Sequence, residues 1–325
     1  MRIMPVDILL PVIVGPATGR GSAGDDPSGG AWRPGDEDDQ PLAIPHAWEC
    51  EPRRPACRPR WEPGRDRRDA GRPRHAPAAP RIMREVSVEV APDLGHVRIN
   101  FNYGNVITTT AAYGEKPRRQ QYCEGPHEAR YRRLLEMSTA VIDYQFQPLV
   151  IRWIDAASRP RAMFPDVGIE LESGAVVFGE IKATSAYLYD PATRAGIDAG
   201  DGVLRPLGAG LVGMAGTPLA KRPFARTVKA AYDDRRHPLS DGAVIRAQSV
   251  IAEEGGAAPL YRVLPALANH PATAMAMLHA AMLRRLLTYD ISRPPTASTP
   301  IVVPAPQERR TLRDLLSRLA QERAA

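Results

Sequence analysis

The chain has 325 residues, 43% of them hydrophobic, with 33 prolines and a formal net charge of +6, which is enough for two ordinary domains or one larger domain with a tail. Its cysteines, Cys50, Cys57 and Cys123, are too few and too scattered for a disulfide framework or a zinc knuckle, so we expect a reduced, cytoplasmic setting. The positive charge falls on residues 81–325 and permits an anionic partner such as nucleic acid, although proteins that bind no nucleic acid often carry a similar charge.

Residues 1–82 show little sign of a folded domain. The opening segment resembles a signal peptide, but Pro5, Asp7 and Pro11 interrupt its apolar run, and no later stretch is long enough to cross a membrane. We therefore expect no membrane partner. Residues 51–80 are rich in Arg and Pro, a composition that cannot bury enough apolar surface to fold. Two interpretations remain open: a disordered basic arm, or translated upstream sequence with the true start at Met83.

Residues 83–217 carry the patterns of an α/β domain. Alternating valines in 84–90 and apolar residues in 97–101 predict a leading hairpin over 84–104. Gly125-Pro126 opens a predicted helix over 124–138, since proline is tolerated in a first helical turn. Strands are then predicted over 141–154, 162–171 and 175–183, a helix capped by Asp190 over 190–208, and a strand over 209–216. The order helix, three strands, helix, strand predicts a layered α/β core.

A second unit is predicted over 218–304, and a separate helix after it. Successive short helical patterns between 225 and 291 precede a strand pattern over 296–304, and three helices followed by a strand pair are the outline of a winged helix. Residues 305–325 form an amphipathic helix with one apolar stripe, made of Leu312, Leu315, Leu316 and Leu319.

Three polar residues stand out on the second and third strands of the α/β core. Asp166 follows a proline, and Glu180 and Lys182 lie two residues apart, so that they share one face of their strand. One strand register brings both carboxylates to the same sheet edge, where they would suit a hard cation such as Mg²⁺, or Mn²⁺ in its place. A lysine beside them can orient a water or stabilise charge on a phosphate. The alternative is a solvated strand face with a cross-strand ion pair.

The segment "PDVGIELESGAVVFGEIK" resembles the PD-(D/E)xK nuclease signature, and the stretch before it resembles the nuclease domain of TnsA-like endonuclease subunits of heteromeric transposases. In that family a helix bearing a catalytic Glu leads through V-x-x-Y-x-x-QP into the first strand, and Val141, Tyr144, Gln147 and Pro148 occupy those places. The resemblance implies a restriction-endonuclease-like core in which Glu128, Asp166 and Glu180 are metal ligands and Lys182 is the catalytic lysine. Pro126-His127 replaces the Ser and Leu that commonly precede the helical Glu, so Glu136 competes with Glu128 for that role.

The resemblance also implies the partners: double-stranded DNA cut at transposon ends, an integrase-type transposase subunit and an ATPase regulator. Two other functions remain open, a free-standing restriction or repair nuclease with the same core and a catalytically silent DNA-binding or scaffold subunit. Further candidates for nucleic-acid contacts are Gln147, the helix residues Arg130, Arg132 and Arg133, and Arg284 with Arg285 at the end of the strongest C-terminal helix. Each has a structural alternative, namely a buried strand amide, a solvated helix face, and charges that favour a helix C-terminus.

Overall fold

The central sheet has five strands in the order β1-β10-β9-β8-β5. The structure, a computed structural model, describes residues 13–14, 84–98, 109–221, 223–306 and 311–324. All of them belong to one unit, Met1–Pro16 with Ile82–Ala325. The strands of this central sheet are β1 (Ile13–Val14), β5 (Val141–Phe146), β8 (Val167–Leu171), β9 (Val176–Lys182) and β10 (Ala209–Ala215). Strands β9 and β10 are parallel, and the other pairs are antiparallel.

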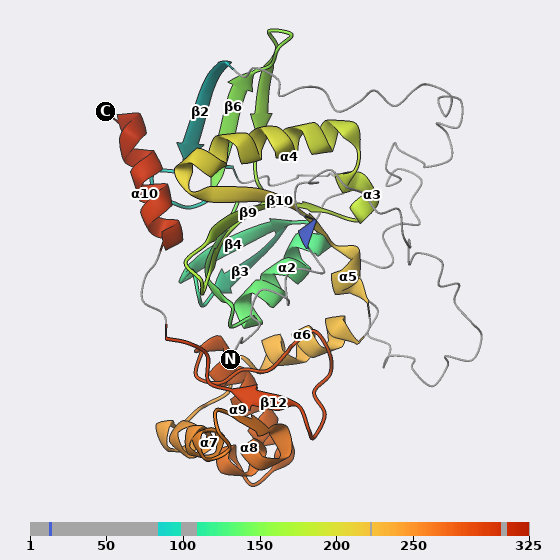
Figure 1. The fold of residues 1–325 in the computed structure, drawn as a ribbon, viewed down its shortest axis with the longest axis vertical. Coiled ribbons are helices and arrows are strands. Elements are labelled where there is room, and N and C mark those ends of the chain that lie inside the picture. The colour runs from blue at the N-terminus through green and yellow to red at the C-terminus, as the bar shows by residue number, and fades with distance from the viewer. Residues whose placement is uncertain (1–12, 15–83, 99–108, 222, 307–310, 325) are drawn as a thin grey trace, which may run out of the picture. The chain divides into compact units, whose positions relative to one another are not determined.

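Two helices cover opposite faces of the central sheet (Figure 1). Helix α2 (Pro126–Met137) buries Tyr131, Leu134 and Leu135 against one face, and α4 (Pro191–Leu204) buries Ile197 and Leu204 against the other. The predicted cap of α4 is confirmed, because the Asp190 carboxylate accepts hydrogen bonds from two backbone N–H groups of the first turn. A short 3-10 turn, η6 (Arg205–Leu207), follows α4, and α3 (Ser185–Leu188) precedes it. The fold is therefore a mixed α/β arrangement.

The strand predicted over 141–154 is in fact two strands that belong to different sheets. It breaks at Gln147-Pro148, where proline has no N–H for a strand ladder and Gln147 has a positive φ of 43°. The strand predicted over 162–171 likewise breaks between Met163 and Val167. The outer halves form a second sheet, β2-β6-β7, made of β2 (Arg84–Val90), β6 (Leu149–Ile154) and β7 (Pro160–Met163).

The predicted hairpin over 84–104 is only partly described. Strand β2 pairs with β6, and residues 99–104 lie outside the described residues. A hairpin that the sequence analysis missed, β3 (Thr109–Gly114) with β4 (Arg119–Glu124), leads directly into α2. Within the predicted extension over 1–82, Ile13–Val14 pair with β10, and the remainder lies outside the described residues.

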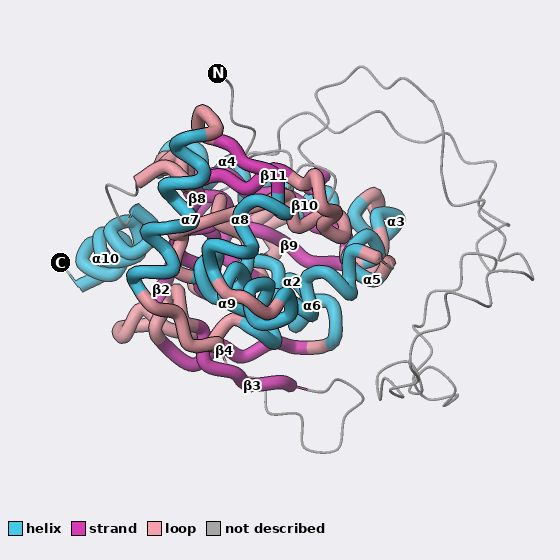
Figure 2. Tube along the Cα trace, turned by 90° about the horizontal axis from the view of Figure 1, so that it is seen from below, coloured by secondary structure: helices cyan, strands magenta, loops and turns pink. Residues whose placement is uncertain are grey.

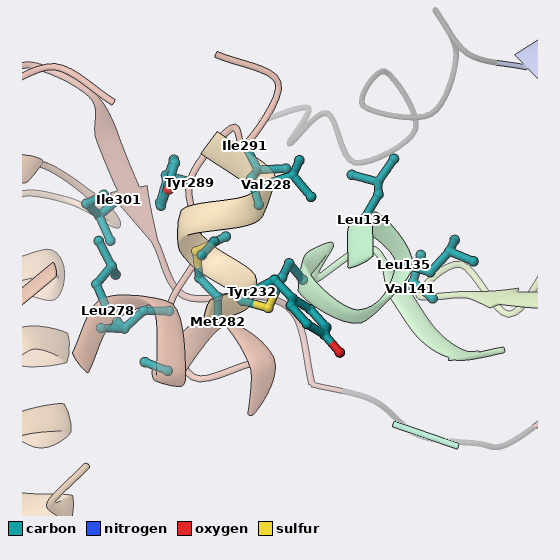
Figure 3. Packing of buried hydrophobic residues seen from close by; sticks show 14 of the residues in the cluster. Leu134, Leu135, Val141, Val228, Tyr232, Leu278, Met282, Tyr289, Ile291 and Ile301 are labelled. Atoms are coloured by element: carbon teal, nitrogen blue, oxygen red, sulfur yellow. The ribbon is translucent and has the colours of Figure 1, made fainter. Parts of the chain in front are cut away.

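The C-terminal helices continue the core on the α2 side of the sheet. They are α5 (Thr217–Ala220), α6 (Phe224–Asp234), α7 (Asp241–Glu253), α8 (Leu260–Leu267) and α9 (Pro271–Leu283), with the two-stranded sheet β11 (Ala257–Pro259) and β12 (Pro300–Val302). Helices α6 and α9 both contact α2 (Figure 2). In Figure 3, Val228 and Tyr232 lie between Leu134 of α2 and the C-terminal residues Leu278 and Met282. The boundary predicted at 217/218 thus runs through a continuous apolar core.

The apolar stripe of the last helix, α10 (Thr311–Ala324), is buried in a second core cluster, which is separate from the one that contains α2. Its four leucines pack near β2 and β8, and Arg313 forms an ion pair with the buried Asp143 at 3.3 Å. No helix in the described ranges combines the length and apolar character needed to cross a bilayer.

Candidate active site

A pocket of about 390 Å³ opens where β8 begins and β9 ends. It gathers side chains from four stretches of the chain, 98, 124–128, 162–166 and 180–182, and all four residues predicted to carry the chemistry lie in its wall. The lining residues are Arg98, Glu124, Glu128, Ala162, Met163, Phe164, Asp166, Glu180, Ile181 and Lys182.

Asp166 is fixed to the pocket through both its backbone and its side chain. The Gln147 N–H donates to the Asp166 carbonyl at 2.9 Å, and the Ile181 N–H donates to the Asp166 carboxylate at 2.6 Å. Val167 pairs with Gly179 in the antiparallel β8–β9 ladder, so Asp166 follows on opposite Glu180. The predicted register, with both carboxylates at one sheet edge, is therefore observed.

Glu180 and Lys182 share one face of β9 because strand side chains alternate. The Lys182 ammonium donates to one Glu180 oxygen at 2.5 Å, and the Lys182 side chain remains about one-third exposed to solvent. The other oxygen of Glu180, Oε2, is buried and has no hydrogen-bond partner among the described residues. An unpaired buried carboxylate oxygen is costly, and it is the kind of atom that a cation or a water would satisfy.

Glu128 enters the pocket from the first turn of α2. Gly125 supplies the positive φ of 98° at the helix start, and the Glu124 N–H donates to the Glu128 carboxylate at 2.7 Å. Glu136, the competing candidate, does not line the pocket. Its carboxylate accepts hydrogen bonds from the Tyr144 hydroxyl and from the Glu115 N–H, which hold it in the core two turns further along the helix.

The carboxylates of the pocket disfavour one another's charge. Burial, followed by the charge of Asp166, raises the pKa of Glu128 to about 9. Burial, followed by the charge of Glu180, raises the pKa of Asp166 to about 7. Burial alone would lower the pKa of Lys182, but the charge and hydrogen bond of Glu180, together with the charges of Asp166 and Glu128, outweigh burial and raise that pKa. Such mutual repulsion is relieved by protonation or by a bound cation.

The donor set fits a hard divalent cation, although it is not drawn together around one. No group of three or more His, Cys, Asp or Glu side chains in the described part of the chain is already arranged to hold a metal ion. Four carboxylates nevertheless share the pocket, burial and a neighbouring acid raise the pKa of Glu128 and of Asp166, and Glu180 Oε2 lacks a partner among the described residues. Carboxylate oxygens are the ligands that Mg²⁺ and Mn²⁺ prefer.

Gln147 does not line the pocket but forms hydrogen bonds with residues that do. Its backbone carbonyl accepts from the Val97 N–H, its N–H donates to Asp166, and its side-chain amide donates to Glu124 at 2.8 Å. Gln147 is buried, so the structure favours the alternative of a structural strand amide.

The arginines proposed for nucleic-acid contacts lie away from the pocket. Arg130 contacts the His127 ring, Arg133 is half-buried, and the buried Arg132 donates to the Tyr232 hydroxyl at 2.7 Å.

The arginines at the end of α9 also lie outside the pocket. Arg284 is exposed, while Arg285 forms an ion pair with Glu172 at 3.3 Å and donates to the Ala305 carbonyl. Most of α9 is buried in the core, so this helix does not present a free face that would fit a DNA groove.

Sequence reasoning missed two charged residues of the pocket, Arg98 and Glu124. Glu124 lies four residues before Glu128, just outside the helix, and this spacing was a usable signal. Arg98 lay within the predicted leading hairpin, where no local pattern distinguished it from an exposed strand residue. No protein-family model matches the chain, and no curated protein matches its sequence.

Proposed function

We propose that the chain is a metal-dependent DNA endonuclease of the TnsA-like class, which hydrolyses phosphodiester bonds at transposon ends as one subunit of a heteromeric transposase. The observation that carries the proposal is the meeting of Glu128, Asp166, Glu180 and Lys182 in one pocket. The residues of a solvated strand face would be exposed. Two of these four, Glu128 and Asp166, are instead more than 90% shielded from solvent, which argues against that alternative.

The residues of the chain would divide the reaction between them. Glu128, Asp166 and Glu180 would hold Mg²⁺ or Mn²⁺, which when bound polarises the phosphate and lowers the pKa of an attacking water. The Ile181 N–H orients the Asp166 carboxylate, and the Glu124 N–H orients that of Glu128. Lys182 is partly exposed at the pocket, where its ammonium would orient the attacking water or offset the charge that develops on the phosphate.

The C-terminal region supports the expected winged-helix-like domain by its element order. Helix α7, strand β11, helices α8 and α9 and strand β12 follow one another, and an isolated bridge joins Thr288 to Val302 of β12. Because α9 is buried, DNA contacts of this domain would come from other surfaces, and the integrase-type transposase and ATPase partners remain part of the proposal.

The test is cleavage of a labelled duplex by the full chain, alone and with the proteins encoded by adjoining genes. Asp166→Asn keeps an oxygen acceptor for the Ile181 N–H and removes the charge, and we expect it to lower the cleavage rate on the order of a thousandfold. Lys182→Met should act similarly. Asp198→Asn is the matched control, because Asp198 is an exposed acid of α4 paired with Arg194, and it should cut like wild type.

Each result separates the proposal from its alternatives. Cleavage by the wild-type chain alone, with a defined sequence preference, would instead indicate a free-standing nuclease. Absence of cleavage in every combination, or equal cleavage by Asp166→Asn, would reject the catalytic assignment and favour a silent DNA-binding subunit.

A further inference from the structure

Arg98 supplies a second positive charge to the pocket, besides that of Lys182. Its side chain lines the cavity and is 36% exposed, so it is accessible from solvent. The pocket otherwise contains four acids, Glu124, Glu128, Asp166 and Glu180, and Lys182 is already engaged with one of them.

The backbone ties Arg98 to the candidate active site. The Val97 N–H donates to the Gln147 carbonyl at 2.9 Å, and the Gln147 N–H donates to the Asp166 carbonyl at the same distance. Two backbone hydrogen bonds therefore connect three segments that are distant in the sequence. Arg98 is thus placed relative to Asp166 by hydrogen bonds, not only by a mobile side chain.

The Arg98 guanidinium is held in place by its neighbours, but its capacity to donate hydrogen bonds is not fully used. Its central carbon lies over the Phe164 ring, 4.5 Å from the ring centre, in a cation–π contact, and one terminal nitrogen lies 3.6 Å from a Glu124 carboxylate oxygen. That distance is long for an ion pair, and Glu124 already accepts a hydrogen bond from Gln147. Arg98 Nε is buried without a partner among the described residues. A planar group with unused N–H donors, facing a pocket, suits the bidentate recognition of a phosphate.

We propose that Arg98 binds a backbone phosphate of the nucleic-acid strand that enters the pocket, and so positions it against Asp166 and Lys182. The inference rests on the proposed function in taking nucleic acid as the ligand. It does not depend on hydrolysis, because binding and cleavage are measured separately.

The experiment measures binding of a fluorescent duplex by anisotropy over a series of KCl concentrations in EDTA. Asp166→Asn serves as the parent, since it removes one carboxylate that would repel the phosphate when no metal is present. Arg98→Gln should weaken affinity about tenfold and reduce the slope of log K against log salt by about 0.9, the loss of one phosphate contact. Arg98→Lys should keep the slope, because the charge remains, but lower the affinity through loss of the fork.

Arg205→Gln is the matched control. Arg205 also forms an ion pair, at 2.6 Å to Asp201. It lies just before β10, whose first residue pairs with the first residue of β9. The pocket lies at the other end of β9, so Arg205 is remote from it. Its affinity and slope should equal those of the parent. Circular dichroism and thermal unfolding check that each variant folds, and Arg98→Lys carries the test if Arg98→Gln does not fold.

The outcomes distinguish this inference from the proposed function. Equal affinity and slope for the parent, Arg98→Gln and Arg98→Lys would overturn the role of Arg98 even if the wild-type chain cuts DNA. A flattened slope for Arg98→Gln in a chain that never cuts DNA would uphold Arg98 and reject hydrolysis. A parent that binds no duplex at any salt concentration would overturn the role of Arg98, while the cleavage assay alone decides the proposed function.

Discussion

Glu128 and Asp166 are carboxyl groups held where their ionised forms are disfavoured. Both are only 8% exposed, and each has another acid of the pocket beside it. A chain selected only for stability would place apolar residues at these positions, since buried like charges oppose folding. At the scale of single residues, these two carboxyl groups therefore lower the stability of the fold, as charged groups in binding sites commonly do.

This property predicts how stability depends on pH. Because Glu128 and Asp166 have raised pKa values in the folded chain, the folded state binds more protons than the unfolded state between about pH 4 and pH 9. Their contribution to the free energy of unfolding is thus largest at low pH and falls as pH rises through 7 toward 9. In metal-free buffer, the Tm of Asp166→Asn minus the Tm of wild type should increase from pH 5 to pH 9.

Thermal unfolding followed by circular dichroism in EDTA measures this difference, with Asp198→Asn as the exposed control. A divalent cation added at pH 8 should narrow it by stabilising the wild-type chain alone. A difference that is constant across the pH range would show that Asp166 does not carry a raised pKa.

At the scale of elements, helix α2 is held at both ends, which fixes Glu128 at the pocket. Carbonyl groups at and after the C-terminal end of the helix accept hydrogen bonds from Lys116, which lies in the turn between β3 and β4. The Lys116 ammonium donates to the carbonyls of Leu135, Ser138 and Val141 at 2.5–2.8 Å. Burial lowers the pKa of Lys116 to about 7, while the charge of Glu136 opposes that shift. Helix ends leave carbonyls without intrahelical partners, and here one buried side chain serves three acceptors.

Replacing Lys116 with Met should cost about 3 kcal/mol of unfolding free energy, because Met fills a similar volume but removes three buried hydrogen bonds to backbone carbonyls, of which the Ser138 carbonyl keeps the Val141 N–H as a donor. Equilibrium unfolding in urea gives the value. Lys229→Met, which removes only an exposed pair with Asp233 one helical turn away, should change it by less than about 0.5 kcal/mol. A loss for Lys116→Met no larger than that of Lys229→Met would contradict this role of Lys116.

At the scale of the whole molecule, the C-terminal half is part of the same folded unit as the site-bearing sheet. Helices α6 and α9 share the core cluster of α2, and α10 lies against β2 and β8 after the chain has left the helical region. The Leu312 N–H even donates to the buried Glu170 of β8. Removal of either region would therefore expose apolar surface of the central sheet or of α2.

The docking of α10 can be tested with Leu316→Ala. Leu316 is 1% exposed within the second core cluster, so the substitution should cost about 3 kcal/mol and lower Tm by several degrees. Ile245→Ala on α7 is the control, because Ile245 is 61% exposed and its loss should leave Tm nearly unchanged. Differential scanning calorimetry measures both. Equal Tm values for the two variants would mean that α10 does not pack on the sheet in solution.

The sequence by itself determined the features that depend on local backbone geometry. Alternation with a period of two put Glu180 and Lys182 on one face of β9, and Gly174, a residue type that favours turns, has a φ of 79° between the predicted strands over 162–171 and 175–183. Asp190 capped α4 as its residue type predicts, and the leucine spacing of α10 marked its buried face. Each of these depends only on neighbours within a few residues.

Only the tertiary structure decided which distant segments meet. It placed Glu128 in the pocket and Glu136 in the core, brought Arg98 and Glu124 beside Asp166, and divided the strand over 141–154 between two sheets. Two glutamates on one helix, or one continuous apolar run, look alike in sequence. What separates them is long-range packing and pairing, which in this chain joins residue 97 to 147 and residue 147 to 166 through hydrogen bonds that no local pattern encodes.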